Sequence, residues 1–456
     1  MKTERLAEKQ RAFFESGRTR DVNFRMAALR RLRDGIGRWE GRIKAALYQD
    51  LHKSSFESYM TEISLVREEI DFLLKHMKEY AGTERVPAVL SQFPGRCFVK
   101  KEPYGTVLVM SPWNYPFLLS LQPAAGAIAA GNCCVIKPSA YAPAVSRCIR
   151  DLARELFSDR YVAVVEGGRE ENAGLLEQKF DYIFFTGSVN VGRLVMEKAA
   201  KHLTPVTLEL GGKSPCIVER DADVDLAAKR IVFGKFLNSG QTCVAPDYCL
   251  VQQEVEKRFL GCLVKWIRRF WGARPLEHPD YPRMVNGKHF DRVMGLISGQ
   301  ETVTGGRGRR STLQIAPTVL RNVSADAPVM REEIFGPVLP VLTYRSLAEA
   351  ESFVAARPRP LALYLFTGKK STARRVMNRL SFGGGCVNDT ILHLASSRMP
   401  FGGVGESGMG SYHGKKSFDT FTHEKSILVR GAWPDVPLRY PPYTKEKEAL
   451  LRISND

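Results

Sequence analysis

The sequence predicts an α/β protein whose first large unit is a doubly wound parallel sheet. Between residues 106 and 210, nearly continuous apolar segments of strand length alternate with segments of helical length. Strands that are apolar on both faces are typical of parallel sheets covered by helices on each side. A second series with the same alternation follows between residues 216 and 366. Ligands of such folds bind where the strands end, so residues that follow a strand are the first candidates for a site.

Each element follows from the local pattern of apolar residues. Residues 1–80 predict helices because apolar residues recur at helical spacing, and residues 81–103 predict short extended pieces outside the main sheet. The first series predicts strands at 106–110, 133–136, 161–166, 182–185 and 206–210, separated by helices at 117–130, 144–157, 171–178 and 191–201. The second predicts strands at 216–218, 248–251, 316–320, 338–343 and 361–366, and helices at 224–237, 255–270 and 290–297. Glycines at 383–385 and 402–403 predict tight backbone passages.

Length and composition exclude several classes of protein. A chain of 456 residues with 44% hydrophobic and 25% charged residues is typical of a globular protein with two or three domains. No apolar run is long enough to span a bilayer, and neither the charged start nor the charged end carries a hydrophobic signal or anchor. Nine cysteines without a CxxC pair suit a reducing cytoplasm. Eight histidines without ligand spacing predict no metal site.

The net charge of +18 would suit a partner that is a nucleic acid or an anionic lipid. The basic residues are, however, spread along predicted helices, and no nucleic-acid-binding signature accompanies them. We therefore expect no nucleic-acid partner and interpret the charge as a solvated surface that steers anionic ligands.

Cys243 is the strongest candidate for a reactive residue. It lies in a polar, turn-prone stretch, residues 238–247, between a predicted helix and a predicted strand. A cysteine in this setting, with backbone amides turned toward it, can be held as a thiolate and is then a strong nucleophile. The alternative is a core cysteine beside a turn, which is the more common place for an isolated free cysteine.

Two polar side chains follow strands of the first series. Glu209 ends the strand 206–210, where desolvation would raise its pKa toward that of a general base; the alternative is a carboxylate that caps the strand end. Asn114 follows the strand 106–110, and its amide can donate to a developing oxyanion; the alternative is an ordinary turn residue.

Two further strand ends suggest a dinucleotide. Lys137 follows the second strand and places a cation where a ribose or a phosphate could lie, although a solvated surface lysine is the alternative. Residues 185–192 form a strand, a glycine turn and a helix, whose N-terminus suits a pyrophosphate. The turn is not GxGxxG, so the usual dinucleotide fingerprint is absent.

Taken together, these stretches resemble the aldehyde dehydrogenase superfamily, and specifically its class 3 branch of fatty and aromatic aldehyde dehydrogenases. The motifs are Pro-Trp-Asn at 112–114, Lys-Pro-Ser at 137–139, Phe-Thr-Gly-Ser at 185–188, Leu-Glu-Leu-Gly-Gly-Lys-Ser-Pro at 208–215, Gly-Gln-Thr-Cys at 240–243, Glu-Glu-Ile-Phe-Gly-Pro at 332–337 and Pro-Phe-Gly-Gly-Val-Gly at 400–405. They occur in the family's order from about residue 20 to about residue 430.

The resemblance implies three units. These are a Rossmann-like dinucleotide-binding domain (1–80 and 104–208), an α/β catalytic domain (209–410) and a small β bridging or oligomerisation segment (81–103 and 411–430), followed by a C-terminal tail (431–456). Relatives of this branch are usually homodimers, so a homodimer without an integral membrane segment is expected.

The resemblance also implies a reaction, the NAD(P)-dependent oxidation of aldehydes to carboxylic acids. Cys243 would attack the aldehyde to give a thiohemiacetal and then a thioester, Asn114 would hold the oxyanion, and Glu209 would activate water. Glu209 favours hydrolysis over the alternative of a coenzyme-A acylating dehydrogenase. The three residues together argue against the other alternative, a non-catalytic basic binding protein on the same fold.

Ligand contacts are implied in the same way. The residues expected to contact NAD or NADP are Trp113, Lys137, Ala140, Gly187, Ser188, Gly192, Leu210, Gly211, Glu333 and Phe335. Those expected to line a funnel for medium- or long-chain aliphatic or aromatic aldehydes are Tyr115, Phe233, Ile391, His393 and His413. Many relatives carry Glu where this chain has Ala140, and the lost carboxylate predicts use of NADP alongside NAD or in preference to it.

Overall fold

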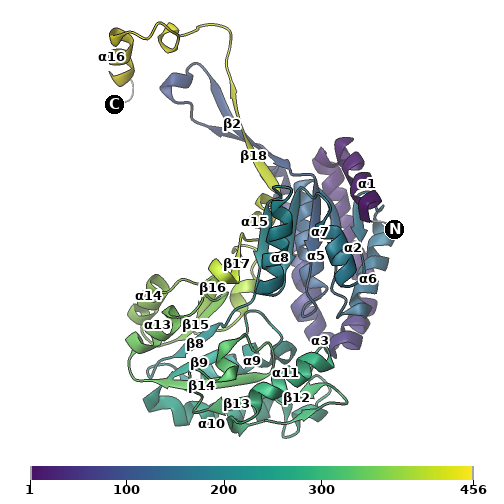
Figure 1. Ribbon diagram of the computed structural model, residues 1–456, viewed down its shortest axis with the longest axis vertical. Coiled ribbons are helices and arrows are strands. Elements are labelled where there is room, and N and C mark those ends of the chain that lie inside the picture. The colour runs from purple at the N-terminus through teal and green to yellow at the C-terminus, as the bar shows by residue number, and fades with distance from the viewer. Residues whose placement is uncertain (1–2, 454–456) are drawn as a thin grey trace.

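Two large, mostly parallel sheets organise the chain, which the computed structural model describes from residue 3 to residue 453 (Figure 1). The outer ends of the predicted segments 1–80 and 431–456 therefore lie outside the described residues. One sheet and its helices form the upper part of the body in Figure 1, and the other forms the lower part. This arrangement confirms the predicted α/β fold class.

The first sheet has six strands in the order β17-β7-β6-β3-β4-β5, and all neighbours are parallel except β17 and β7. The strands are β3 (Thr106–Met110), β4 (Cys133–Lys137), β5 (Val162–Val164), β6 (Tyr182–Thr186), β7 (Val206–Glu209) and β17 (Gly408–Met409). Alternate residues of β3 belong to different cores: Val107 and Val109 pack on one face, whereas Leu108 and Met110 pack on the other. The sheet is thus buried on both sides, as its apolar strands predict.

Helices cover both faces of this sheet. They are α1 (Thr3–Glu15), α2 (Val22–Leu51), α3 (Ser55–Ser58), the π-helix η2 (Tyr59–Ile63), α4 (Ser64–Tyr80), α5 (Leu118–Ala130), α6 (Pro143–Leu156), α7 (Arg169–Leu176) and α8 (Val189–Ala200). Helices α2, α4, α5 and α6 share one core with the sheet, and α1, α7 and α8 share the other.

The second sheet has seven strands in the order β10-β13-β14-β9-β8-β15-β16, and β10 alone among them runs antiparallel to its neighbour. The strands are β8 (Pro215–Val218), β9 (Tyr248–Gln252), β10 (Glu301–Thr304), β13 (Thr318–Arg321), β14 (Val338–Tyr344), β15 (Ala362–Phe366) and β16 (Gly384–Val387). Its helices are α9 (Val224–Phe236), α10 (Glu256–Trp271), α11 (Gly287–Ile297), α12 (Pro328–Arg331), α13 (Leu347–Ala355) and α14 (Lys370–Arg379).

Several elements of this region were not predicted from the sequence. Gly384 and Gly385 belong to β16, and a Cβ on Gly385 would collide with Leu363 O of β15, so this glycine allows the two strands to pair closely. Helices α13 and α14, strand β10 and the short strands β11 (Gly308–Arg309) and β12 (Gln314–Ile315) were also missed.

A third, antiparallel sheet projects from the body (Figure 1). It joins β1 (Thr83–Val86) and β2 (Arg96–Pro103) to β18 (Thr422–Val429), which follows α15 (Lys415–Asp419). Asn132 ties its base to the body, because Asn132 Oδ1 accepts from Gly105 N at 2.8 Å and Asn132 Nδ2 donates to Phe421 O at 2.9 Å. Beyond β18 the tail runs to α16 (Lys445–Ile453), at the outer end of the projection.

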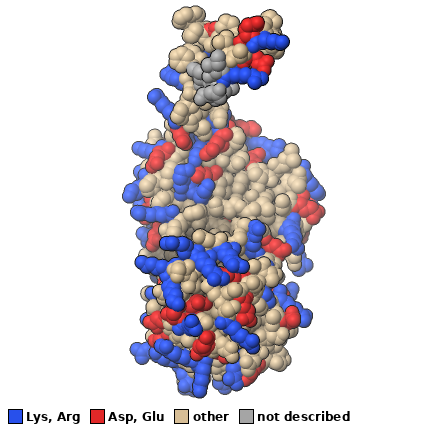
Figure 2. Space-filling view, turned by 90° about the vertical axis from the view of Figure 1, so that its left-hand side faces the viewer, with Lys and Arg blue, Asp and Glu red and all other residues tan. Residues whose placement is uncertain are grey.

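The surface carries its charge without a single dominant patch on the face that Figure 2 shows. Lys and Arg side chains are interspersed with Asp and Glu over the lower part of the body and along the edges of its upper part, whose centre is mostly uncharged. Within residues 3–453, none of the helices combines the length and apolarity that a bilayer span would need.

Candidate active site

The polar residues that follow or end the strands of the first sheet, Asn114 and Glu209, meet the turn that carries Cys243 between the two large sheets. Asn114, Glu209 and Cys243 line one cavity, which has about 1190 Å³ of empty space. Cys243 also lines a second cavity of about 990 Å³. The thiol therefore stands between two hollows of different character, one running along the strand ends and the other lined mostly by apolar side chains.

The cysteine is presented by a left-handed turn. After α9 the backbone passes through η4 (Leu237–Gly240), in which Asn238, Ser239 and Gly240 have φ values of 51°, 55° and 71°. A Cβ on Gly240 would collide with Gly336 O, so only glycine fits there. Gln241 secures the turn, because its side chain donates to Asn238 O and accepts from Val285 N, each at 3.0 Å.

Burial and the backbone amides of the turn act on the Cys243 thiol in opposite directions. Burial raises its pKa to about 12, and the nearby carboxyls of Glu333 and Glu209 act in the same direction. The backbone N–H groups of Cys243 and Val244 lower the pKa, as expected for amides turned toward the sulfur, but burial has the larger effect.

Glu209 is enclosed at the end of β7. Burial raises the pKa of its carboxyl well above the usual range. Both carboxyl oxygens lie buried without a hydrogen-bond partner among the described residues, and Glu209 lines the same cavity as Cys243. Buried carboxyl oxygens normally accept hydrogen bonds, so these two oxygens can accept hydrogen bonds from a water molecule or a ligand.

Asn114 reaches the cysteine turn from the opposite sheet. Its Nδ2 donates to Gln241 O at 3.0 Å, two residues before Cys243, and the side chain is almost fully buried. The amide has two N–H groups, and only one is needed for this bond.

The cavity along the strand ends collects most of the predicted cofactor residues. Those that line it are Trp113, Gly187, Ser188, Leu210, Gly211, Glu333 and Phe335. Ser188 precedes α8, and its side chain makes no capping hydrogen bond. The backbone amides of the first turn of α8, beside the cavity, therefore have no capping acceptor. Trp113 and Phe335 stand edge to face with ring centres 5.3 Å apart.

Glu333 is the carboxyl among these predicted lining residues. Burial raises its pKa to about 8, and the backbone N–H of Gly212 lowers it in part. A Cβ on Gly211 would collide with the Glu333 carboxyl, and Glu333 Oε1 is buried without a partner among the described residues. The carboxyl thus has a free acceptor beside the cavity, as a ribose hydroxyl would require.

Three predicted cofactor residues lie outside this lining. Gly192 lies behind it, where a Cβ would come within 2.6 Å of Leu210 Cδ2, so glycine lets α8 pack closely. Lys137 is buried, and its Nζ donates to Pro138 O at 2.9 Å and Gly167 O at 2.7 Å, which is not the open cation that the sequence suggested. Burial lowers the Lys137 pKa to about 8. Ala140 is exposed.

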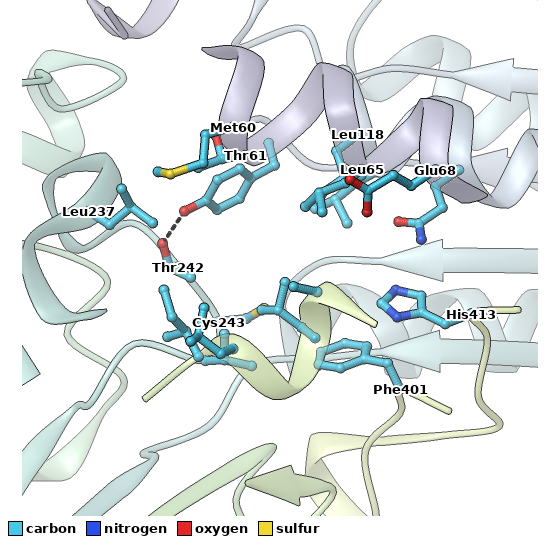
Figure 3. A pocket seen from close by; sticks show the side chains of 18 of the residues that line it. Met60, Thr61, Leu65, Glu68, Leu118, Leu237, Thr242, Cys243, Phe401 and His413 are labelled. Atoms are coloured by element: carbon cyan, nitrogen blue, oxygen red, sulfur yellow. Dashed lines mark hydrogen bonds between the residues drawn. The ribbon is translucent and has the colours of Figure 1, made fainter. Parts of the chain in front are cut away.

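The second cavity holds most of the predicted funnel residues, namely Tyr115, Phe233, Ile391 and His413. Tyr115 Oη and Thr242 Oγ1 are 2.7 Å apart, which fixes the aromatic ring beside the cysteine turn (Figure 3). Polar side chains, Glu68 and His413, lie at the end away from Thr242 (Figure 3). His393 does not line the cavity: it lies beside Phe401, with ring centres 6.1 Å apart, and its Nδ1 is 3.6 Å from Cys386 Sγ.

Several lining residues were missed from the sequence. Phe401 and Tyr412 line both cavities, and Phe401 belongs to the Pro-Phe-Gly-Gly motif, which could have identified it. His289 lies 5.0 Å from Trp113 by ring centres and, like Arg292, lines the cavity along the strand ends; nothing in the local sequence distinguishes either residue. Met60 and Leu65 line the apolar cavity, although helical periodicity alone assigns that region to packing. Within residues 3–453, no group of three His, Cys, Asp or Glu side chains could hold a metal ion.

Comparison with known proteins agrees with this geometry. The model of the aldehyde dehydrogenase family matches residues 2–427. The 4,4'-diaponeurosporen-aldehyde dehydrogenase of Staphylococcus aureus is 48% identical over 435 residues, which cover 95% of this chain and 95% of that protein. The dimeric NADP-preferring aldehyde dehydrogenase of Canis lupus familiaris is 44% identical over 443 residues, which cover 97% of this chain and 98% of that protein.

A solved structure, the substrate-bound state of Staphylococcus aureus AldH, superposes with a TM-score of 0.97 at 47% identity and covers 99% of both chains. Aldehyde dehydrogenase family 3 member B1 of Homo sapiens, 44% identical over 450 residues that cover 97% of this chain and 95% of that protein, supports the class 3 resemblance. The chain therefore belongs to the aldehyde dehydrogenase family and is an NAD(P)-dependent oxidoreductase that acts on aldehydes.

Proposed function

We propose that this enzyme oxidises medium- or long-chain aliphatic or aromatic aldehydes to carboxylic acids, with Cys243 as nucleophile, Asn114 as oxyanion donor and Glu209 as general base. The observation that carries the proposal is the position of Cys243 between an apolar cavity and the cavity along the strand ends. An aldehyde in the first and a nicotinamide in the second would meet at the sulfur.

In the first step, Cys243 Sγ gives its proton to a water molecule and bonds to the aldehyde carbon, and the electron pair of the C=O double bond moves to the oxygen, which becomes an oxyanion. The second N–H of the Asn114 amide and the Cys243 backbone N–H donate to this oxygen, each donor contributing about 3 kcal/mol in comparable sites. Oxidation of the thiohemiacetal to a thioester needs a hydride acceptor, which the nicotinamide ring of NAD(P) supplies when bound.

In the second step, Glu209 removes a proton from water, and the oxygen of that water attacks the thioester carbon. The C–S bond breaks, the carboxylic acid leaves and Cys243 regains its proton. The unpartnered oxygens of Glu209 support this role, because a buried acceptor facing the cavity can bind water.

The chain's own residues fit a dinucleotide. Glu333 would hold the nicotinamide ribose through its free oxygen, Trp113 and Phe335 would pack beside the ring, and the first turn of α8 would hold the pyrophosphate through backbone amides.

Cys243→Ala should lower turnover by more than about 10³-fold, because no other group replaces the nucleophile. Glu209→Gln should instead give one rapid burst of NAD(P)H followed by slow turnover, since only thioester hydrolysis loses its base. Rapid-mixing absorbance measures both effects, and Cys262→Ala, which removes another partly exposed thiol, serves as the control. Loss of the burst in Glu209→Gln would assign Glu209 to activation of the thiol.

The apolar cavity supports the preference for longer aldehydes. Each methylene buried against its walls contributes up to about 0.8 kcal/mol, so kcat/KM should rise with chain length from acetaldehyde upward. Phe233→Trp should narrow the cavity and weaken this dependence. A steady-state series of straight-chain and aromatic aldehydes tests the prediction, and a flat series for the wild type would contradict it.

We also propose that NADP is used at least as well as NAD. Ala140 is exposed, and the two carboxylates nearest Lys137 are already engaged: Glu171 accepts from Gly168 N at 2.6 Å, and Glu166 pairs with Arg150. Ala140 itself adds no carboxylate that would repel a 2′-phosphate. The relative from Canis lupus familiaris is named as NADP-preferring.

Ala140→Glu should therefore shift the ratio of kcat/KM for NADP and NAD toward NAD by about tenfold to a hundredfold. Ala140→Gln is the control, since it adds similar bulk without charge. An unchanged ratio would show that this position does not select the cofactor.

A homodimer is proposed from the projecting sheet. Strand β18 is an edge strand that pairs with β2, and its outer backbone groups offer a template for another chain. Apolar side chains near it, including Val429 and Trp433, are exposed in one chain. The relative from Canis lupus familiaris is named as dimeric.

Analytical ultracentrifugation should accordingly give about twice the chain mass of 51.1 kDa. Replacing Val429 and Trp433 together by Glu should favour the single chain, because the charges would be buried on association. A wild type that sediments as one chain at micromolar concentration would refute the dimer.

A further inference from the structure

Three ionisable side chains of one short segment are buried beneath the active site without taking part in the proposed chemistry. Lys53 and Glu62 are fully buried, and Glu57 is 8% exposed. Lys53 precedes α3, Glu57 lies on α3, and Glu62 lies in the π-helix η2. Buried charges cost free energy unless they are paired, and π-helical turns are frequent at functional sites, so this cluster calls for a physical reason.

Lys53 holds the backbone of Asn114. Its Nζ donates to Glu62 Oε1 at 2.6 Å and to Asn114 O at 3.0 Å. The same ammonium lies 3.9 Å from the ring centre of Tyr115. Asn114 O also accepts from Asn238 Nδ2 at 2.7 Å, so two donors from different parts of the chain fix one carbonyl.

Glu62 fixes the residues that follow. Its Oε2 accepts from Phe117 N at 2.8 Å and from Leu118 N at 3.1 Å, at the start of α5. A carboxylate at a helix N-terminus satisfies free amides and interacts favourably with the helix dipole. The segment from Asn114 to Leu118 is thus held at both ends by the Lys53–Glu62 pair.

Glu57 extends the network to the cysteine turn. Its Oε1 accepts from Asn238 N at 2.9 Å, at the start of the left-handed turn. Asn238 Nδ2 also lies 3.2 Å from Gln241 O, the acceptor of the Asn114 side chain. Continuous hydrogen bonds therefore join the segment 53–62, the donor amide and the turn that carries the nucleophile.

From these contacts we propose that Lys53, Glu57, Glu62 and Asn238 are positioning residues, which hold the Asn114 amide in place as oxyanion donor beside Cys243. This inference rests on the role proposed above for Asn114. The four residues act through Asn114 and do not touch the aldehyde. A displacement of such a donor by about 1 Å can slow a reaction by about 100-fold, so a rigid support matters for rate.

The first test replaces the pair together, Lys53→Met with Glu62→Gln. Both members of the Lys53–Glu62 ion pair are removed together, and the introduced glutamine side chain keeps an oxygen for the two amides of α5. Single-turnover formation of NAD(P)H should slow by about 10- to 100-fold, while KM for the aldehyde stays within about twofold. Hydrolysis of 4-nitrophenyl acetate by Cys243 should slow similarly, because acylation needs the same oxyanion donor but no nicotinamide.

A double-mutant cycle separates positioning from a merely structural role. In an Asn114→Ala background the paired substitution should cause no further loss of rate, because the donor it positions is absent. Rate losses that multiply in the combined variant would overturn the inference. Wild-type rates for Asn114→Ala alone would instead refute the proposed role of Asn114 itself, so the two failures are distinguishable.

Asn238→Gly is a second variant, which tests the positioning of Asn114 even if the paired variant does not fold. Glycine keeps the left-handed backbone and the N–H from which Glu57 accepts, and it removes the side-chain amide that donates to Asn114 O and Gln241 O. A slowed single turnover with unchanged KM supports the proposal, and wild-type rates overturn it.

Glu351→Gln provides the matched control. Glu351 is 1% exposed and binds Arg375 through two hydrogen bonds of 2.9 and 2.7 Å, far along the chain from the segment 53–62. Its substitution should lower the midpoint of thermal unfolding without changing the single-turnover rate. Equal slowing by Glu351→Gln would show that loss of the ion pair of a buried carboxylate, and not positioning, explains the effect.

Discussion

The hydrogen bond from Asn114 Nδ2 to Gln241 O joins the two large sheets at the point where the chemistry takes place. Asn114 follows β3 of the first sheet, and Gln241 belongs to the turn that leads from α9 to Cys243 beside the second. The distance between the amide and the thiol therefore depends on how the sheets pack against each other. Buried groups from a third region, before and within η2, accordingly bind Asn114 and Asn238, which begins the same turn.

Burial has two opposite effects in this site. It raises the pKa values of Cys243, Glu209 and Glu333, which favours the protonated forms of all three groups. The same low dielectric strengthens the interaction of these groups with any charge that a ligand brings. A nearby cation would therefore favour the thiolate of Cys243.

Much of the fold could be predicted because its strands are apolar on both faces and its helices are amphipathic. The strands β3, β4, β6 and β8 lie close to the predicted ranges. Strand β16 was missed because its glycines pair closely with β15 and carry no apolar pattern. The residues proposed for the chemistry could be found because each follows a strand or a turn, where a parallel sheet exposes its ligand-binding edge.

The sequence by itself determined the order of the strands along the chain, the family motifs and the candidates Cys243, Glu209 and Asn114. Only the tertiary structure decided which charged residues are buried. The sequence alone suggests ordinary surface charges at Lys53, Glu57 and Glu62. It also suggests a free cation at Lys137 and a funnel residue at His393. The physical reason is that burial of a charge depends on partners distant in sequence, such as Asn114 O for Lys53 and Asn238 N for Glu57, and no local periodicity encodes those contacts.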